Sequence, residues 1–199
     1  MSISQDELLS LVRAQSGHFV HESGYHSDAW WHLEALCHHP VELLPYVNAL
    51  AAQIEQYQPD VICGALVEGA FVALLSACKL NTDFAYALRS EGDPKRLFSV
   101  SYHLAHARRN VVNGKRVVIA TDVISAGSAV RGALEDVERH GGHVVAVASL
   151  MVLGNTFAEF CQARRLPLIS LFQQEFRMWL PSECPLCAAG GIPDYLAHH

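Results

Sequence analysis

The segment Val117–Val130 carries residue types that can bind a small anion. An apolar stretch leads through Asp122 into a turn of small residues that opens a helix. The turn consists of Ser125, Ala126, Gly127, Ser128 and Ala129. Small side chains let a phosphate approach backbone N–H groups, and the positive end of a helix favours its charge. The pattern therefore predicts a phosphate site, with an ordinary strand–turn–helix connection as the alternative.

Asp122 follows this predicted strand by one residue. A carboxylate at that point is placed to accept hydrogen bonds from ribose hydroxyls or to hold a metal-bound water. Neither Gly-x-Gly-x-x-Gly nor Gly-Lys-Ser/Thr occurs in the chain. The segment is therefore neither a dinucleotide fingerprint nor a Walker A loop.

The order of apolar residues, acid and small-residue turn resembles the phosphoribosyl-diphosphate (PRPP) motif of type I phosphoribosyltransferases. Residues 16–28, with Gly-x-Phe, Ser-Gly and Ser-Asp, are similar to the N-terminal segment of orotate phosphoribosyltransferases. Residues 60–70 look like their pyrophosphate loop, and Lys115 before the PRPP strand also fits. The resemblance extends from about residue 4 to 165.

This resemblance implies a reaction in which a ring nitrogen of a nucleobase displaces pyrophosphate from C1 of PRPP, with Mg²⁺ bridging diphosphate and ribose oxygens. Residues 125–129 would hold the 5′-phosphate and Asp122 the ribose hydroxyls. The diphosphate and its metal would lie at Val67, Glu68 and Gly69, so that Asp122 and Glu68 are the acids near Mg²⁺.

The resemblance also implies a base pocket and a basic lid. Phe19 and the segment around Ser27 would line the base pocket. Arg89, Lys95 and Arg96 would belong to the lid, and Lys95 and Arg96 together with Asp122 would be the catalytic residues. A homodimer is implied as well, in which the lid of one subunit reaches the site of the other.

The chain departs from the family pattern at three places. Thr121 stands where the first acid of the PRPP motif is expected, which weakens ribose and metal recognition without abolishing it. Val152 and Leu153 replace the Asp-Arg pair that receives the orotate carboxylate, and an apolar side chain cannot pair that charge. The lid motif matches only loosely, which leaves open the basic residue that meets the diphosphate. A catalytically weak or inactive protein that binds PRPP or a nucleotide for regulation is therefore the alternative function.

The elements that must position these residues follow an alternating pattern. Apolar runs at 61–66, 84–88, 116–120, 143–151 and 166–172 predict strands, and residues 97–103 are predicted to form a hairpin strand. Helices are predicted over 69–80, 128–140 and 155–165. Alternating strands and helices predict an α/β fold with a mostly parallel central sheet, here the type I phosphoribosyltransferase fold.

Two helices are predicted before this core. A capping box at Ser4–Glu7 begins a helix that continues to about Ala14. A second helix runs from Pro40 to about Gln58, and its predicted apolar stripe is Val41, Leu44, Val47, Leu50, Ala51 and Ile54. We expect one domain over 1–199, with an N-terminal hood at 1–39, a core at 60–172 and an irregular tail at 181–199.

The composition suits a protein that binds small charged molecules. The chain has 199 residues, is 51% hydrophobic and has a net charge of -6, which argues against binding to nucleic acid or to an anionic membrane. Seven of its 14 basic residues lie within 89–116, beside only two acids. Such a concentrated basic segment suits a small anion. No signal peptide or apolar span is evident, so we expect a cytoplasmic protein.

The six cysteines are predicted to be reduced and buried. Cys184 and Cys187 have the spacing of a zinc knuckle, with His103, His106, His198 and His199 as further ligands, but a tight turn with packed thiols is favoured because no second such motif exists. Six of the 12 histidines fall between His18 and His39, and solvent-facing or hydrogen-bonded rings are favoured there over a metal cluster.

Overall fold

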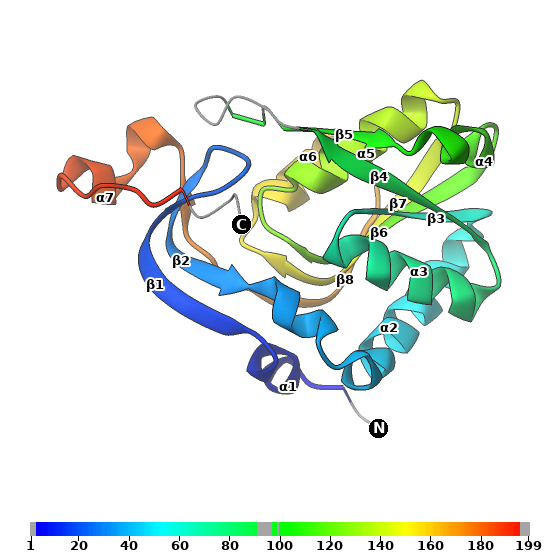
Figure 1. Cartoon of the computed structure of the whole chain (residues 1–199), viewed down its shortest axis with the longest axis horizontal. Coiled ribbons are helices and arrows are strands. Elements are labelled where there is room, and N and C mark those ends of the chain that lie inside the picture. The colour runs from blue at the N-terminus through cyan, green and yellow to red at the C-terminus, as the bar shows by residue number, and fades with distance from the viewer. Residues whose placement is uncertain (1–2, 91–96, 99, 196–199) are drawn as a thin grey trace.

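The computed structural model describes residues 3–90, 97–98 and 100–195. Its central sheet has six strands in the order β5-β4-β3-β6-β7-β8 (Figure 1). The strands are β3 Val61–Ala65, β4 Asp83–Ser90, β5 Ser101–Leu104, β6 Arg116–Ile124, β7 His143–Leu153 and β8 Leu168–Gln174. Neighbouring strands are parallel except β4 and β5, which are antiparallel. The expected α/β fold with a mostly parallel sheet is confirmed.

Helices cover both faces of this sheet. They are α2 Pro40–Ile54, α3 Glu68–Leu80, α4 Arg109–Val112, α5 Ser128–Arg139 and α6 Thr156–Ala163. Alternate residues of β6 enter two separate cores: Val118 and Ala120 join the core that contains α2 and α3, and Val117 and Ile119 join the one that contains α5. A strand buried on both faces explains why 116–120 is continuously apolar.

A second, smaller sheet forms the hood. Its strands are β1 Arg13–Val20, β2 His26–His32 and β9 Met178–Trp179, all antiparallel, and α1 Gln5–Ser10 precedes them. Figure 1 shows β1 and β2 curving away from the central sheet. The tail, which contains α7 Pro185–Ala188, follows these two strands. Short 3₁₀ turns occupy Leu33–Cys37, Glu55–Tyr57, His106–Arg108 and Pro181–Glu183. The described part of the tail, residues 181–195, consists of the turn Pro181–Glu183, the short helix α7 and irregular segments.

Two sequence expectations need correction at the N-terminal half. The first helix begins as predicted, with the Glu7 N–H donating to Ser4 Oγ (3.2 Å), but it ends at Ser10 and a strand starts at Arg13. In α2 the predicted apolar stripe is wrong at Val41 and Leu44, whose side chains are exposed. The buried face begins instead at Leu43 and Tyr46 and then continues along the predicted stripe. Residues Arg13–Val20 form a strand because they pair with β2, and the local spacing of apolar residues cannot show this pairing.

All six cysteines are free thiols, as expected. Their predicted burial is wrong for Cys78, which is exposed on α3. Within the described ranges, every helix is too short or too polar to cross a membrane.

Candidate functional site

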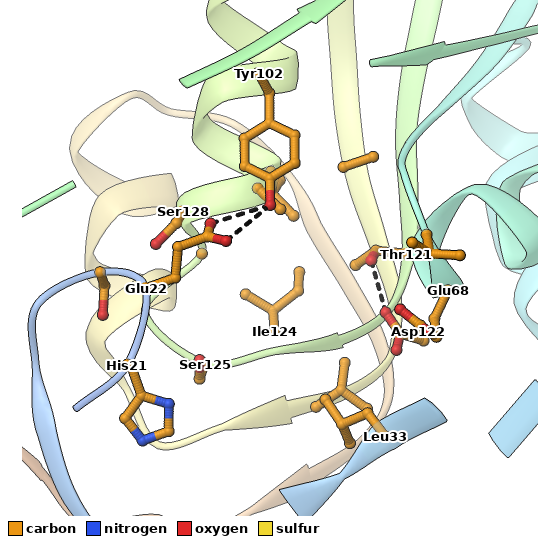
Figure 2. Close-up of a pocket in the computed structure, with 18 of the residues that line it drawn as sticks. His21, Glu22, Leu33, Glu68, Tyr102, Thr121, Asp122, Ile124, Ser125 and Ser128 are labelled. Carbon is orange, nitrogen blue, oxygen red and sulfur yellow. Dashed lines mark hydrogen bonds between the residues drawn. The ribbon is translucent and has the colours of Figure 1, made fainter. Parts of the chain in front are cut away.

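A cavity of about 330 Å³ opens at the carboxyl ends of β3 and β6 (Figure 2). Its lining comes from the hood, the β3–α3 loop, β5, the end of β6 and the start of α5. Carboxyl ends of parallel strands are where α/β folds place ligands. Most predicted site residues meet here: Val67, Glu68, Gly69, Asp122, Ser125, Gly127, Ser128 and Ala129.

The loop between β6 and α5 is shaped by Gly127. This residue has φ +81°, and a Cβ atom on it would lie 2.1 Å from the buried ring of Phe157. Glycine is therefore required both by the backbone conformation and by the packing. Ala126 does not line the cavity, because its side chain is buried in the core, and its carbonyl accepts a hydrogen bond from Arg131 Nε (3.0 Å).

The start of α3 lies against β6 because Gly69 has no side chain. A Cβ atom on Gly69 would lie 2.4 Å from Thr121 Oγ1. This close approach brings Glu68 beside Asp122, and Figure 2 shows the two carboxylates at the same end of the cavity. The cavity thus holds an acidic pair contributed by two elements, although the PRPP-like segment itself supplies only one acid.

Asp122 lies within β6, two residues before its end, rather than after the strand as expected. The pKa of its carboxyl is raised to about 6: burial raises it most and the charge of Glu68 adds to the rise, while hydrogen bonds from the Val123 N–H and the Thr121 hydroxyl lower it. Thr121 Oγ1 donates to Asp122 Oδ1 at 2.9 Å. Thr121 therefore orients the remaining acid, and this carboxylate changes charge close to neutral pH.

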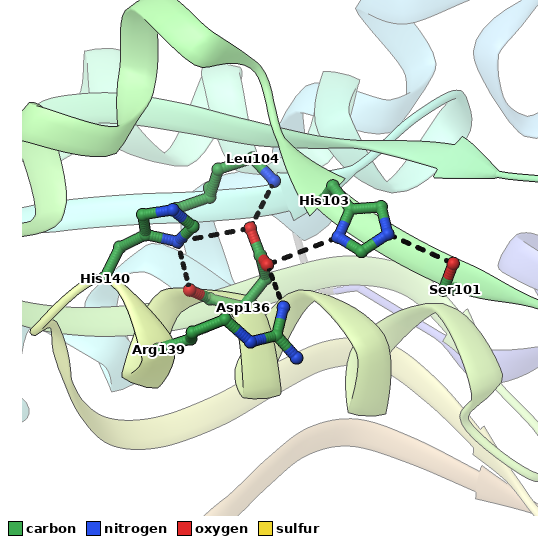
Figure 3. Close-up of polar contacts among 6 residues, drawn as sticks. All are labelled: Ser101, His103, Leu104, Asp136, Arg139 and His140. Carbon is green, nitrogen blue, oxygen red and sulfur yellow. Dashed lines mark hydrogen bonds and ion pairs between the residues drawn. The ribbon is translucent and has the colours of Figure 1, made fainter.

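A second buried carboxylate, Asp136 on α5, lies outside the cavity (Figure 3). It accepts hydrogen bonds from the Leu104 N–H (2.7 Å), His103 Nδ1 (3.3 Å) and Arg139, and His140 Nδ1 lies 3.4 Å away. Burial would raise its pKa, but the Leu104 N–H and the basic groups outweigh burial and lower it. Asp136 fastens α5 to β5.

The turn of the hood hairpin contributes residues that the sequence analysis missed. Glu22 accepts hydrogen bonds from the Tyr102 hydroxyl (3.0 and 3.1 Å) and from Arg89 Nε (2.8 Å). The predicted lid residue Arg89 therefore contacts the hood at the edge of the cavity. No local signal marks Glu22, because its partners lie on β4 and β5, more than 60 residues away.

His21 and Trp30 form an aromatic wall of the cavity. Their rings stack with centroids 5.4 Å apart, and His21 Nε2 lies 2.7 Å from Ser27 Oγ. Burial, and then the charge of His26, lower the pKa of His21 to about 4, so its ring is neutral at pH 7.

The two predicted base-pocket residues do not line the cavity themselves. Ser27 is buried and bonds to His21, while the buried Phe19 ring lies 6.2 Å from the ring of Trp30. Both support the aromatic wall from behind. The sequence pattern identified the correct segment, but within it His21, Glu22 and Ser23 are the residues that line the cavity.

Other predicted residues fall elsewhere. Lys95 and Arg96 lie outside the described residues. Val152 and Leu153 are buried at the end of β7 and do not line the cavity. Among the described residues, the lining contains three carboxylates and no lysine or arginine. Within the described lining, backbone N–H groups and hydroxyls are the groups that could hold an anion.

Curated relatives span nearly the whole chain, although no family model matches it. An orotate phosphoribosyltransferase of Heliobacterium modesticaldum is 30% identical over 200 residues, covering 94% of this chain and 95% of the relative. One from Carboxydothermus hydrogenoformans is 28% identical over 178 residues, covering 87% and 85%.

Solved structures share the fold at low sequence identity. Adenine phosphoribosyltransferase from Thermoanaerobacter pseudethanolicus aligns with a TM-score of 0.65 at 19% identity, covering 85% of this chain and 99% of that one. Orotate phosphoribosyltransferase from Aeropyrum pernix aligns with a TM-score of 0.61 at 18% identity, covering 80% and 87%. The Mycobacterium tuberculosis orotate enzyme in complex with PRPP aligns with a TM-score of 0.55 at 18% identity, covering 72% and 80%.

Proposed function

Because the chain belongs to the orotate phosphoribosyltransferase family, we propose that it transfers the 5-phosphoribosyl group of PRPP to a nucleobase and releases pyrophosphate. The observation that carries the proposal is a single cavity in which Asp122, the 125–129 loop and the 67–69 loop face one another. PRPP needs a separate binding group for each of its three parts: the 125–129 loop for the 5′-phosphate, Asp122 for the ribose and the 67–69 loop for the diphosphate.

The loop would hold the 5′-phosphate through backbone N–H groups at the start of α5 and the hydroxyls of Ser125 and Ser128. Asp122, when ionised, would accept hydrogen bonds from the ribose hydroxyls and stabilise the positive charge that develops on the sugar as pyrophosphate leaves. The reaction needs positioning and charge neutralisation rather than a covalent nucleophile.

The acidic pair Asp122 and Glu68 fits Mg²⁺, which prefers carboxylate oxygens and water. Both carboxylates face the end of the cavity beside the 67–69 loop, and Glu68 raises the pKa of Asp122, which a cation between them would reverse. When bound, Mg²⁺ would neutralise negative charge on the diphosphate and so assist its departure.

The aromatic wall of His21 and Trp30 supports stacking of a flat base. Its described residues supply no cation for the carboxylate that orotate carries, and Leu153 is buried. The nucleobases that are tested as acceptors must therefore include some with a carboxylate and some without. Two departures from the family pattern, Thr121 in place of an acid and Leu153 in place of a base-binding arginine, support a second candidate, a protein that binds PRPP or a nucleotide without turnover.

The test is Mg²⁺-dependent pyrophosphate release from PRPP with orotate, uracil, adenine, hypoxanthine or xanthine, with the nucleotide product identified by mass spectrometry. Turnover with one base and none in EDTA supports the transferase. PRPP binding by calorimetry with no nucleotide from any base supports the second candidate. Absence of both binding and turnover contradicts both.

We propose that the protein acts as a homodimer in the cytoplasm, as the family resemblance implies. Exposed apolar residues on two neighbouring helices support a self-interface: Val41 and Leu44 on α2, and Phe71 and Leu74 on α3. Light scattering should give twice the 21.9 kDa chain mass, and Phe71→Glu should shift it toward one chain.

A further inference from the structure

Four side chains of metal-ligating type meet outside the cavity, from opposite ends of the chain. They are His18 and His26 of the hood hairpin and Cys184 and Cys187 of the tail, and their donor atoms all lie within 4.8 Å of one another. We propose that they bind one structural Zn²⁺ ion in a Cys₂His₂ site that fastens the tail to the hood. The inference goes beyond the proposed transfer reaction, because none of the four residues lines the cavity.

The donor atoms stand close to the separations that zinc imposes. His18 Nε2 lies 3.4 Å from Cys184 Sγ and 3.6 Å from Cys187 Sγ, while His26 Nδ1 lies 3.3 Å from Cys187 Sγ and 3.0 Å from His18 Nε2. Tetrahedral zinc, with Zn–S of about 2.3 Å and Zn–N of about 2.0–2.1 Å, sets S–N separations of about 3.5 Å and N–N separations of about 3.4 Å.

Hydrogen bonds within the cluster do not account for this arrangement. His18 Nε2 faces three polar atoms at once, whereas an imidazole nitrogen carries either one hydrogen or one lone pair. His18 Nδ1 is buried with no hydrogen-bond partner among the described residues, so the polar neighbours of the ring gather at Nε2. A cation at the centre would accept a lone pair from each of the four groups.

Two thiolates and two imidazoles in tetrahedral arrangement select zinc over the hard cations. Binding would require both thiols to ionise, and their two protons would be released to solvent. The Cys-Pro-Leu-Cys turn supports the geometry: α7 starts directly after Cys184, the Ala188 N–H donates to the Cys184 carbonyl (3.1 Å), and the Gly190 N–H donates to the Cys187 carbonyl (2.9 Å).

Backbone pairing brings the two halves of the site together. The Asp194 N–H donates to the His18 carbonyl (2.6 Å), and the Val20 N–H donates to the Asp194 carbonyl (2.8 Å). On the other strand, His26 pairs with Trp179 of β9. Zinc would close a junction that these hydrogen bonds already align, and it would fix the hairpin whose turn reaches the cavity.

This proposal revises two expectations from the sequence. The sequence favours packed thiols over zinc and offers His103, His106, His198 and His199 as the partners of the thiols. His103 instead bonds to Asp136, and the last two lie outside the described residues. The histidines that meet the thiols come from the histidine-rich segment for which a metal cluster was not favoured. Spacing could not show this, because pairing between hood and tail creates the site.

The first experiment measures metal content by mass spectrometry in tag-free protein that has been passed through a metal-free column. We expect about one zinc ion per chain. Cys184→Ser and Cys187→Ser should each lose most of it, whereas Cys78→Ser, at the exposed thiol of α3, should retain it. Zinc that stays at full occupancy in a Cys184→Ser/Cys187→Ser double variant would overturn the proposal.

A second measurement uses the wild-type chain and does not depend on the folding of variants. Titration with an organic mercurial should release zinc in proportion to thiol loss, as read with a coloured chelator. Protein refolded with Co²⁺ should show the intense visible bands of a tetrahedral site and thiolate-to-cobalt charge transfer. A weak octahedral spectrum, or a Cys184–Cys187 disulfide in the protein as purified, would contradict a zinc site.

Discussion

Asp122 and Asp136 are both buried, yet their surroundings push their pKa values in opposite directions. At Asp122, burial and the charge of Glu68 prevail over the few hydrogen bonds that the carboxylate receives, and the pKa rises to about 6. At Asp136, the Leu104 N–H and three basic side chains prevail over burial, and the pKa falls. The hydrogen bonds to Asp122 are too few to offset its burial, whereas those to Asp136 outweigh it.

The difference separates a binding role from a structural role. A buried charge without enough partners costs folding free energy and is retained where a ligand supplies what is missing. Asp122 faces the cavity, and ribose hydroxyls or Mg²⁺ would complete its hydrogen bonding. Asp136 faces the junction of α5 and β5, where the Leu104 N–H and three basic side chains already stabilise its charge. Variants of the two residues should therefore fail in different ways.

The largest expected effect belongs to Asp122→Asn. Turnover of PRPP should fall about 100- to 1,000-fold, because the amide cannot supply the negative charge that stabilises the transition state. The melting temperature at pH 7.5 should stay the same or rise, because the variant removes a buried charge of raised pKa.

The matched control for this variant is Asp83→Asn. Asp83 is exposed at the first residue of β4, at the opposite end of the sheet from the cavity. Both its turnover and its melting temperature should be those of the wild type. If Asp122→Asn lost stability in parallel with turnover, the contrast between the two aspartates would fail, and Asp122 would have a structural role.

Asp136→Ala should have the converse effect. Removal of this carboxylate leaves the buried Leu104 N–H without an acceptor and should lower the free energy of unfolding by about 2–4 kcal/mol, measured by urea denaturation. At temperatures where the variant is folded, the KM for PRPP should change less than about threefold. A stable variant with a large loss of turnover would place Asp136 in the reaction instead.

The sequence predicts the site residues that are consecutive in the chain, but it does not predict those whose partners are distant in the chain. The 125–129 turn and Asp122 were found because strand, acid and small residues are consecutive. Asp136 was not singled out, because its acceptor role depends on the Leu104 backbone, 32 residues earlier in the chain. Glu22 was missed for the same reason, since the hairpin turn that carries it meets β5 only after folding.

The pH dependence of stability should show the two opposite signs. Asp122 has a folded pKa near 6 against an ordinary value of 3.8, so the folded state binds its proton more tightly, and stability falls as pH rises from about 4 to 6. Relative to Asp122→Asn, the wild type should lose about 2–3 kcal/mol across this window.

Asp136 should show the reverse, because its folded pKa is lowered. Its contribution is present above the ordinary pKa and is lost as pH falls through the folded value. Urea denaturation of the wild type, Asp122→Asn and Asp136→Asn from pH 2.5 to 8 separates the contributions of the two carboxylates to the free energy of unfolding. Parallel curves for wild type and Asp122→Asn between pH 4 and 7 would contradict the raised pKa of Asp122.

The smallest expected effect tests how Thr121 serves the acid beside it. Thr121→Val keeps the shape of the side chain but removes the hydroxyl that donates to Asp122 Oδ1 (2.9 Å). This hydrogen bond lowers the pKa of Asp122, so its loss should move the acid limb of the kcat/KM profile to higher pH by about half a unit to one unit, and kcat/KM at pH 6.5 should fall about 1.5- to threefold. Thr121→Ser retains the hydroxyl and should keep the wild-type profile. If Thr121→Ser shifted the profile and Thr121→Val did not, the methyl group would position Asp122, and the hydroxyl would have no part in it.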